Sequence, residues 1–201
     1  SILRPINKPH QPNGGLKMLS GNLGKAVIKI SAVSENNRVI TAPAQVFSNE
    51  ADVKIAYNNG ELNKNVVVVV LAQGPQANGM PELHSLTPIL ANLQDKGFKV
   101  AVVTDGRMSG ASGKIPAAIH VFPEAVNGGN IGRIKNGDII TVDATSGKLE
   151  VKEEISSRAP FSIASKDNPN SFGRSLFAQM RSQSANAEAG GGISINLGQN
   201  K

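Results

Sequence analysis

The chain has 201 residues, a formal net charge of +6 and 39% hydrophobic residues. These values are typical of one folded domain with its own core and exclude wholesale disorder. The chain contains no cysteine, which excludes disulfides, thiolate nucleophiles and iron–sulfur ligands within it. Three histidines are too few for a convincing transition-metal site built on imidazole ligands alone.

Charge and hydropathy also limit the partners. The longest apolar run, residues 66–72, is too short to cross a bilayer, and the first residues lack a signal-peptide pattern. We therefore expect a cytoplasmic protein whose start without Met indicates a processed or cut end. The basic residues are scattered, and 3% aromatic residues leave little to stack on bases. Small anions are the expected ligands, rather than nucleic acid or a membrane.

The first half of the chain predicts mostly strands. Residues 1–20 are rich in Pro, Gly and Asn, so we expect an irregular arm or the remnant of a linker. Strands are predicted at 26–33 and 38–47, followed by a short helix at 50–57. The β-branched run at 66–72 is typical of a strand that is buried on both faces.

A helix and two strands are predicted next. Leucines at helical spacing predict a helix over 82–96, in which Pro88 either causes a kink or delays the start. Residues 99–104 read as another buried strand, and residues 115–121 as a further strand.

The last part of the chain completes the predicted domain. Residues 138–142 and 148–152 form a predicted hairpin, and 172–183 a closing helix with Leu176, Phe177 and Met180 facing inward. A loose or partner-packed tail is expected over 185–201. Residues 21–184 are therefore predicted to form one mixed α/β domain with a β-rich, barrel-like part.

Two glycine-containing loops, at 74–82 and 105–114, each follow a predicted buried strand. Adjacent parallel strands would place both loops at the carboxyl edge of one sheet, where α/β proteins bind ligands. The glycines of the second loop allow a close backbone approach to an anion. This loop lacks the spacing of a phosphate-binding P-loop. A serine hydrolase needs glycines two residues before and two residues after its serine, and neither Ser109 nor Ser112 has both.

The segment VTDGRMSGASGKIPAAIHVFPEA, residues 103–125, resembles the carboxy-terminal signature of the dihydroxy-acid/6-phosphogluconate dehydratase family. Residues 21–29 and 79–82 also resemble this family, and the resemblance extends from about Gly21 to Phe177. Met108 and the segment 111–120 resemble the 6-phosphogluconate branch. Dihydroxy-acid dehydratases usually have Phe at position 108 and a glycine pair after the serine.

The resemblance implies a hydro-lyase that converts 6-phosphogluconate to 2-keto-3-deoxy-6-phosphogluconate in the Entner–Doudoroff pathway. It also implies a swivelling β/β/α-type domain and a homodimer. In the family a cysteine-bound iron–sulfur cluster, expected to be 4Fe-4S, lies in the preceding amino-terminal domain. The cluster ligands would then lie outside this chain, and the isolated chain would be inactive.

The resemblance also implies roles for individual residues. Ser109 matches the serine that acts as the base at C2, and Glu82 matches an acidic ligand of a divalent cation, expected to be magnesium. Arg107, Ser112 and Lys114 are candidates for binding the substrate carboxylate or phosphate. Without the resemblance, Glu82 is equally an ordinary helix N-terminal carboxylate, and the other three equally brace the loop or lie on the surface.

Other residues near the loops are assigned structural roles. Asp105 is expected to orient Arg107 or to cap the loop, whereas His84 and His120 are read as structural. The alternative enzymes are dihydroxy-acid dehydratase or another sugar-acid dehydratase of the same family. An aconitase-like small subunit has a related design, but its motifs do not resemble this sequence. The non-enzymatic alternative is a basic anion-binding module.

Overall fold

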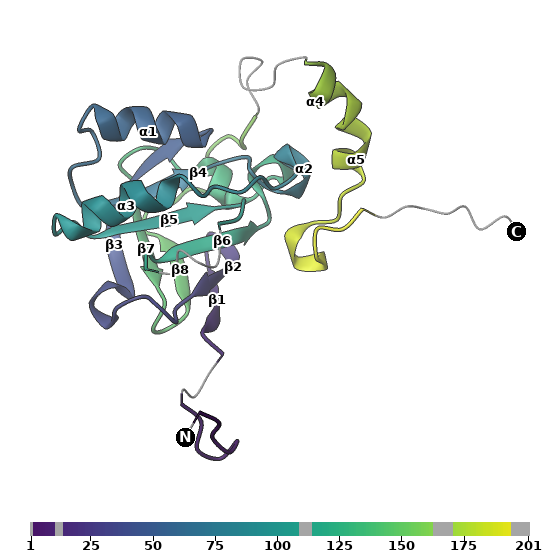
Figure 1. Cartoon of the computed structure of the whole chain (residues 1–201). Helices are drawn as coiled ribbons and strands as arrows, with labels where there is room; N and C mark the ends of the chain where they lie inside the picture. The colour runs from purple at the N-terminus through teal and green to yellow at the C-terminus, as the bar shows by residue number, and fades with distance from the viewer. Residues whose placement is uncertain (1, 11–13, 109–113, 163–170, 194–201) are drawn as a thin grey trace, which may run out of the picture.

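The computed structural model describes residues 2–10, 14–108, 114–162 and 171–193 (Figure 1). The strands within these residues close into one mixed barrel, which confirms the predicted mixed α/β domain with a barrel-like part. In the order in which they neighbour each other around the barrel, the strands are β1 (Leu16–Gly21), β2 (Gly24–Lys29), β6 (Ala117–Phe122), β5 (Val100–Thr104), β4 (Val66–Val70), β3 (Val39–Phe47), β7 (Ile139–Asp143) and β8 (Lys148–Val151).

Helices and short 3₁₀ turns connect and flank these strands. They are η1 (Glu35–Asn37), α1 (Glu50–Asn58), α2 (Pro75–Asn78), α3 (Leu86–Asp95), η3 (Ala125–Asn127), η4 (Asn130–Arg133), α4 (Phe172–Leu176), α5 (Ala178–Ser182) and η5 (Ala187–Ala189). Within the part of the chain that the structure describes, none of these helices has the length and apolar character needed to span a membrane.

Strand β3 joins the parallel and antiparallel parts of the barrel. Its first half pairs antiparallel with β7, and its second half, from Ala44, pairs parallel with β4. The predicted hairpin is confirmed as β7 and β8, which pair antiparallel up to Asp143 and Lys148. Strands β4, β5 and β6 are parallel neighbours, so the chain leaves all three at the same edge of the sheet.

Strand β4 separates two hydrophobic cores. All five of its valines have an exposed fraction of 0%. Val67 and Val69 pack into the barrel interior, whereas Val66, Val68 and Val70 pack beneath α1 and α3. This alternation follows from the two-residue period of a strand. It confirms the prediction that the valine run is buried on both faces.

The predicted helix over 82–96 begins later than expected. Helix α3 starts at Leu86, so Pro88 lies in its first turn, where a missing N–H costs no helical hydrogen bond. The carboxylate of Glu50 in α1 accepts hydrogen bonds from the backbone N–H groups of Ser85, at 2.7 Å, and Leu86, at 3.2 Å. This cap comes from a distant segment, which the local sequence could not indicate.

The expectation of an irregular arm over 1–20 is wrong for its last residues, because Leu16–Gly21 form β1. This strand pairs with β2 in continuous antiparallel register, from Leu16 opposite Lys29 to Gly21 opposite Gly24. Leu16 is exposed and Leu19 is buried, so β1 presents one face to the core. Its pairing, rather than strong strand propensity, defines the element.

A narrow seam between β1 and β8 closes the barrel. The two strands pair in parallel at one position, Ser20 opposite Lys148. The backbone N–H of Ser20 donates to the Gly147 carbonyl at 2.9 Å. Beyond this position, the Asn22 side-chain amide takes the place of backbone bonds between the two strands. It donates to the Val151 carbonyl at 2.7 Å and accepts from the Val151 N–H at 2.8 Å.

The predicted closing helix over 172–183 is two short helices, α4 and α5, in a carboxy-terminal arm (Figure 1). We use this name for the described residues 171–193. The expectation that its apolar side chains face inward is wrong, because Leu176 is 60%, Phe177 51% and Met180 45% exposed. Helix α5 of the arm contacts α2, and the η5 turn contacts β6 of the barrel, where Glu188 pairs with Lys25 of β2.

Candidate functional site

The segments that follow β4 and β5 meet at the carboxyl edge of the sheet, as the sequence predicted. Val70, the last residue of β4, is opposite Thr104, the last residue of β5. Beyond the strands, Glu82 and Arg107 form an isolated parallel bridge, and the Leu83 N–H donates to the Arg107 carbonyl at 3.1 Å. The two loops therefore form one surface, on which the candidate site lies.

Glu82 and Arg107 are the two predicted site residues that the structure brings together. Their side chains form an ion pair, with 3.0 Å between Arg107 Nη1 and Glu82 Oε2. Arg107 Nε also donates to the Met80 carbonyl at 2.8 Å. The guanidinium thus joins both loops, while the Arg107 side chain has an exposed fraction of 49% and is accessible to a ligand.

The other carboxylate oxygen of Glu82 has the character of a metal ligand. Oε1 is buried and has no hydrogen-bond partner among the described residues. An orphaned carboxylate oxygen is costly unless a cation or donor compensates it, and magnesium prefers oxygen ligands of this type. The described residues contain no group of three His, Asp or Glu side chains that could hold a metal. Glu82 therefore fits as one ligand of a cation that needs further ligands.

Asp105 holds the start of the second loop in place. Its carboxylate, with an exposed fraction of 0%, accepts backbone N–H bonds from Ala72 at 3.2 Å, Gln73 at 2.9 Å and Ala125 at 2.9 Å. Burial raises the pKa of Asp105, and the three amides offset part of this rise. Of the two roles considered for Asp105, these contacts support capping of the loop.

Glu124 is a second buried carboxylate, which the sequence analysis did not single out. It accepts N–H bonds from Gln76 at 3.2 Å and Ala77 at 3.1 Å, in the first turn of α2. Burial raises the pKa of Glu124, and the nearby charge of Asp105 raises it further. The local signal for this role was an acidic residue two positions after the end of β6.

Three residues around this edge have left-handed backbone conformations although none is glycine. They are Ala72 and Met80, each with φ of 57°, and His120, with φ of 56°. Such conformations cost about 1–3 kcal/mol each and persist only where surrounding contacts enforce them. The backbone N–H of His120, for example, donates to the Gly106 carbonyl at 2.9 Å. Strain that clusters in this way is typical of a functional site.

The imidazole of His120 lies on β6 near this edge. Burial lowers its pKa, and the positive charge of Arg107 lowers it further. His120 is therefore neutral at physiological pH and can stay close to Arg107 without charge repulsion. This agrees with the structural role expected for it.

Lys114 lies away from Glu82 and Arg107. Its ammonium pairs with Asp95 at 2.8 Å, at the end of α3, and both side chains are more than half exposed. The chain must return to the amino edge of the sheet before it enters β6, which is parallel to β5. The substrate-binding roles of Lys114 and Arg107 stay predictions. Ser109 and Ser112 lie outside the described residues, and their roles also stay predictions.

Close packing at Gly74 provides a test of this architecture. A Cβ atom at Gly74 would collide with the carboxylate of Glu124. We expect Gly74→Ala to destabilise the full-length protein by about 1–3 kcal/mol in denaturant unfolding. Gly14→Ala is the matched control, because a Cβ there meets nothing within 4 Å. Equal stability of the two variants would contradict the packing described.

Known proteins resemble almost the whole chain. The chain is 54% identical to the phosphogluconate dehydratase of Rhizobium meliloti (strain 1021) over 195 residues, which are 96% of this chain and 32% of that protein. It is 50% identical to the phosphogluconate dehydratase of Pseudomonas aeruginosa over 192 residues, 94% of this chain and 32% of that protein. A dihydroxy-acid dehydratase of Clostridium botulinum is 41% identical over 163 residues, 78% of this chain and 29% of that protein.

The chain thus spans about a third of the length of these relatives. The family described as "Dihydroxy-acid/6-phosphogluconate dehydratase C-terminal" matches residues 1–191, which include every element of the described fold and both loops of the site. The chain belongs to this dehydratase family.

Proposed function

We propose that this chain is the carboxy-terminal part of a hydro-lyase that dehydrates 6-phosphogluconate to 2-keto-3-deoxy-6-phosphogluconate. The observation that supports this substrate best is the pattern of relatives. Phosphogluconate dehydratases match 94–96% of the chain at 47–54% identity, whereas the dihydroxy-acid dehydratase matches 78% at 41%. The Entner–Doudoroff pathway is where such a product is consumed.

The reaction needs a base at C2 and assistance for hydroxide departure from C3. In the proposal the Ser109 alkoxide accepts the C2 proton, and the electron pair of the C2–H bond forms the C2–C3 double bond. The C3–O bond breaks, and the oxygen leaves with its electron pair and takes up a proton to become water. The resulting enol then tautomerises to the 2-keto acid. A serine hydroxyl is a weak acid, so its alkoxide requires nearby N–H donors or positive charge, which a glycine-rich loop is suited to supply.

A direct assay of the full-length protein tests this proposal. We expect 2-keto acid to form from 6-phosphogluconate with a kcat/KM at least tenfold above that for 2,3-dihydroxyisovalerate. The reverse preference would favour the dihydroxy-acid alternative. No turnover of either substrate, by protein with its metals intact, would contradict the assignment as a dehydratase of these acids.

Glu82 is proposed to ligate a divalent cation, expected to be magnesium, through the orphaned Oε1. When bound, such a cation would grip the substrate carboxylate and C2 hydroxyl. We expect Glu82→Gln to weaken binding of the cation by about 10- to 100-fold. Mn²⁺ titration of the full-length protein, followed by electron paramagnetic resonance, measures this affinity independently of activity.

Glu61→Gln is the matched control for this experiment, because Glu61 is an exposed glutamate whose described contact is to Asn59. It should leave Mn²⁺ affinity unchanged. If Glu82→Gln binds Mn²⁺ as tightly as the unsubstituted protein, Glu82 is not a metal ligand.

The remaining partners stay proposals. A 4Fe-4S cluster would be held by cysteines outside this chain, since the chain has none. The exposed apolar residues of the carboxy-terminal arm suit a contact with the amino-terminal cluster-binding domain. The homodimer, the cytoplasmic location and the domain boundary at residue 184 also remain predictions. The swivelling β/β/α design is a further prediction, which the mixed barrel with α1 and α3 packed against β4 and β5 supports.

A further inference from the structure

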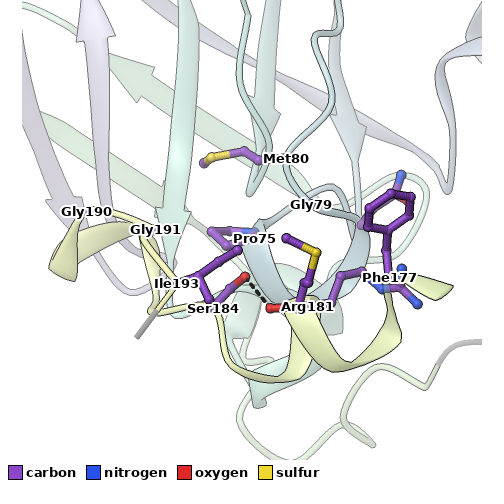
Figure 2. Close-up of a pocket in the computed structure, with 11 residues that line it drawn as sticks. Pro75, Gly79, Met80, Phe177, Arg181, Ser184, Gly190, Gly191 and Ile193 are labelled. Atoms are coloured by element: carbon purple, nitrogen blue, oxygen red, sulfur yellow. Dashed lines mark hydrogen bonds between the residues drawn. The ribbon is translucent and has the colours of Figure 1, made fainter. Parts of the chain in front are cut away.

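A pocket of about 460 Å³ lies between the loop after β4 and the carboxy-terminal arm (Figure 2). Most of its wall is apolar, and the polar side chains in the wall are Asn78, Arg181 and Ser184. The apolar residues that line it are Pro75, Met80, Phe177, Met180 and Ile193. A charged group inside such a wall is partly shielded from water, which strengthens its attraction for an opposite charge.

Arg181 is the charged group of this pocket, and Figure 2 shows it beside Phe177. Its Nη2 donates to the Arg174 carbonyl at 2.8 Å. A guanidinium has five N–H donors, and this is its only hydrogen bond among the described residues. The ion pairs within those residues do not include Arg181. Most of its donors, and its full charge, are therefore available to an anion.

A second guanidinium lies next to the first. Arg174 is fixed to α2, because Nη1 donates to Asn78 Oδ1 at 3.1 Å and Nη2 to the Ala77 carbonyl at 3.0 Å. Burial lowers the pKa of Arg174, and the charge of Arg181 lowers it further. Two neighbouring positive charges repel each other, so a dianion bound by Arg181 would reduce this repulsion.

The pocket adjoins the candidate site at Met80. Met80 lines the pocket, and its carbonyl accepts the Arg107 Nε hydrogen bond at 2.8 Å. A sugar-acid phosphate has an anionic group at each end. If the carboxylate end of the substrate binds at Glu82 and Arg107, its phosphate end lies next to this pocket.

We propose that the pocket binds the phosphate monoester of the substrate, with Arg181 as its principal ligand and Arg174 as supporting charge. This inference rests on the proposed function and extends it to substrate specificity. The pocket distinguishes phosphorylated from unphosphorylated sugar acids. Arg is suited to this task because its planar donors match two phosphate oxygens at once.

The test compares full-length protein carrying Arg181→Ala or Arg181→Lys with the unsubstituted protein. We expect Arg181→Ala to raise KM for 6-phosphogluconate by about 10- to 100-fold, as for loss of a charge-assisted hydrogen bond. Turnover of gluconate should not change, and Arg181→Lys should recover part of the loss. Arg38→Ala is the matched control, since Arg38 directly follows η1, pairs with Glu35 and does not line the pocket.

Binding of inorganic phosphate, measured by calorimetry, separates this proposal from the proposed function. The unsubstituted protein should bind phosphate and Arg181→Ala should bind it at least tenfold more weakly, whether or not 6-phosphogluconate is a substrate. Equal phosphate affinity and equal KM in a folded Arg181→Ala protein would overturn the subsite and leave the dehydratase assignment intact. If Arg181→Ala lowers the melting temperature but leaves phosphate affinity unchanged, Arg181 stabilises a contact within the protein. That result also overturns the proposed phosphate subsite.

Discussion

Asp105→Asn should lower kcat of the full-length enzyme by about 100-fold, because misplacement of a catalytic loop by about 1 Å has an effect of this size. The carboxylate accepts three backbone N–H groups, from two segments that are distant in sequence. An asparagine has one acceptor oxygen, and its NH₂ group would face amide donors. We also expect the free energy of unfolding to fall by about 2–3 kcal/mol.

Asp52→Asn is the matched control, because Asp52 is exposed on α1, where its carboxylate contacts Asn49. Denaturant unfolding and steady-state kinetics should both show little change in this variant. KM separates positioning from general damage, since a displaced base lowers kcat more than it weakens substrate binding. If Asp105→Asn retains normal kcat, Asp105 does not position the loop that contains Ser109.

Ser109→Ala should abolish turnover, with a decrease of kcat of about 10²- to 10⁴-fold for loss of a general base. The melting temperature should remain that of the unsubstituted enzyme, because a single hydroxyl is removed from a loop. The decisive measurement is exchange of the C2 proton of 6-phosphogluconate with solvent deuterium. The base hypothesis requires exchange to disappear together with turnover.

Ser112→Ala provides the comparison within the same loop. A substrate-binding serine should change KM more than kcat, whereas a base should change kcat more than KM. Normal kcat in Ser109→Ala would remove Ser109 from the role of base. Equal effects of the two substitutions on kcat would mean that the loop, rather than one hydroxyl, is required.

Patterns with a short sequence period predicted much of this fold. The valine run of β4 indicated burial on both faces because each face of a strand receives alternate residues. The order of strand, loop, helix and strand predicted that the loops containing Glu82 and Arg107 would lie at one edge of the sheet, since parallel neighbours end there. The ion pair between the two side chains was not predicted. In both cases the prediction followed from backbone geometry.

Features that depend on distant segments were not predictable. Glu50 of α1 caps the start of α3, and Glu124, which follows β6, accepts a backbone N–H bond from α2. The apolar side chains of α4 and α5 have helical spacing, which predicted burial, yet they are exposed. Helical spacing shows that a helix has an apolar face. It does not show whether the surface that packs against this face belongs to the same chain segment.

The seam between β1 and β8 constrains when the domain can finish folding. Strand β8 is the last strand of the barrel in the chain, and its pairing partner β1 is the first. A ribosome must therefore translate beyond Val151 before Asn22 can find its backbone partners. Until then the nascent chain has two unpaired strand edges, which are the positions where association with other chains begins.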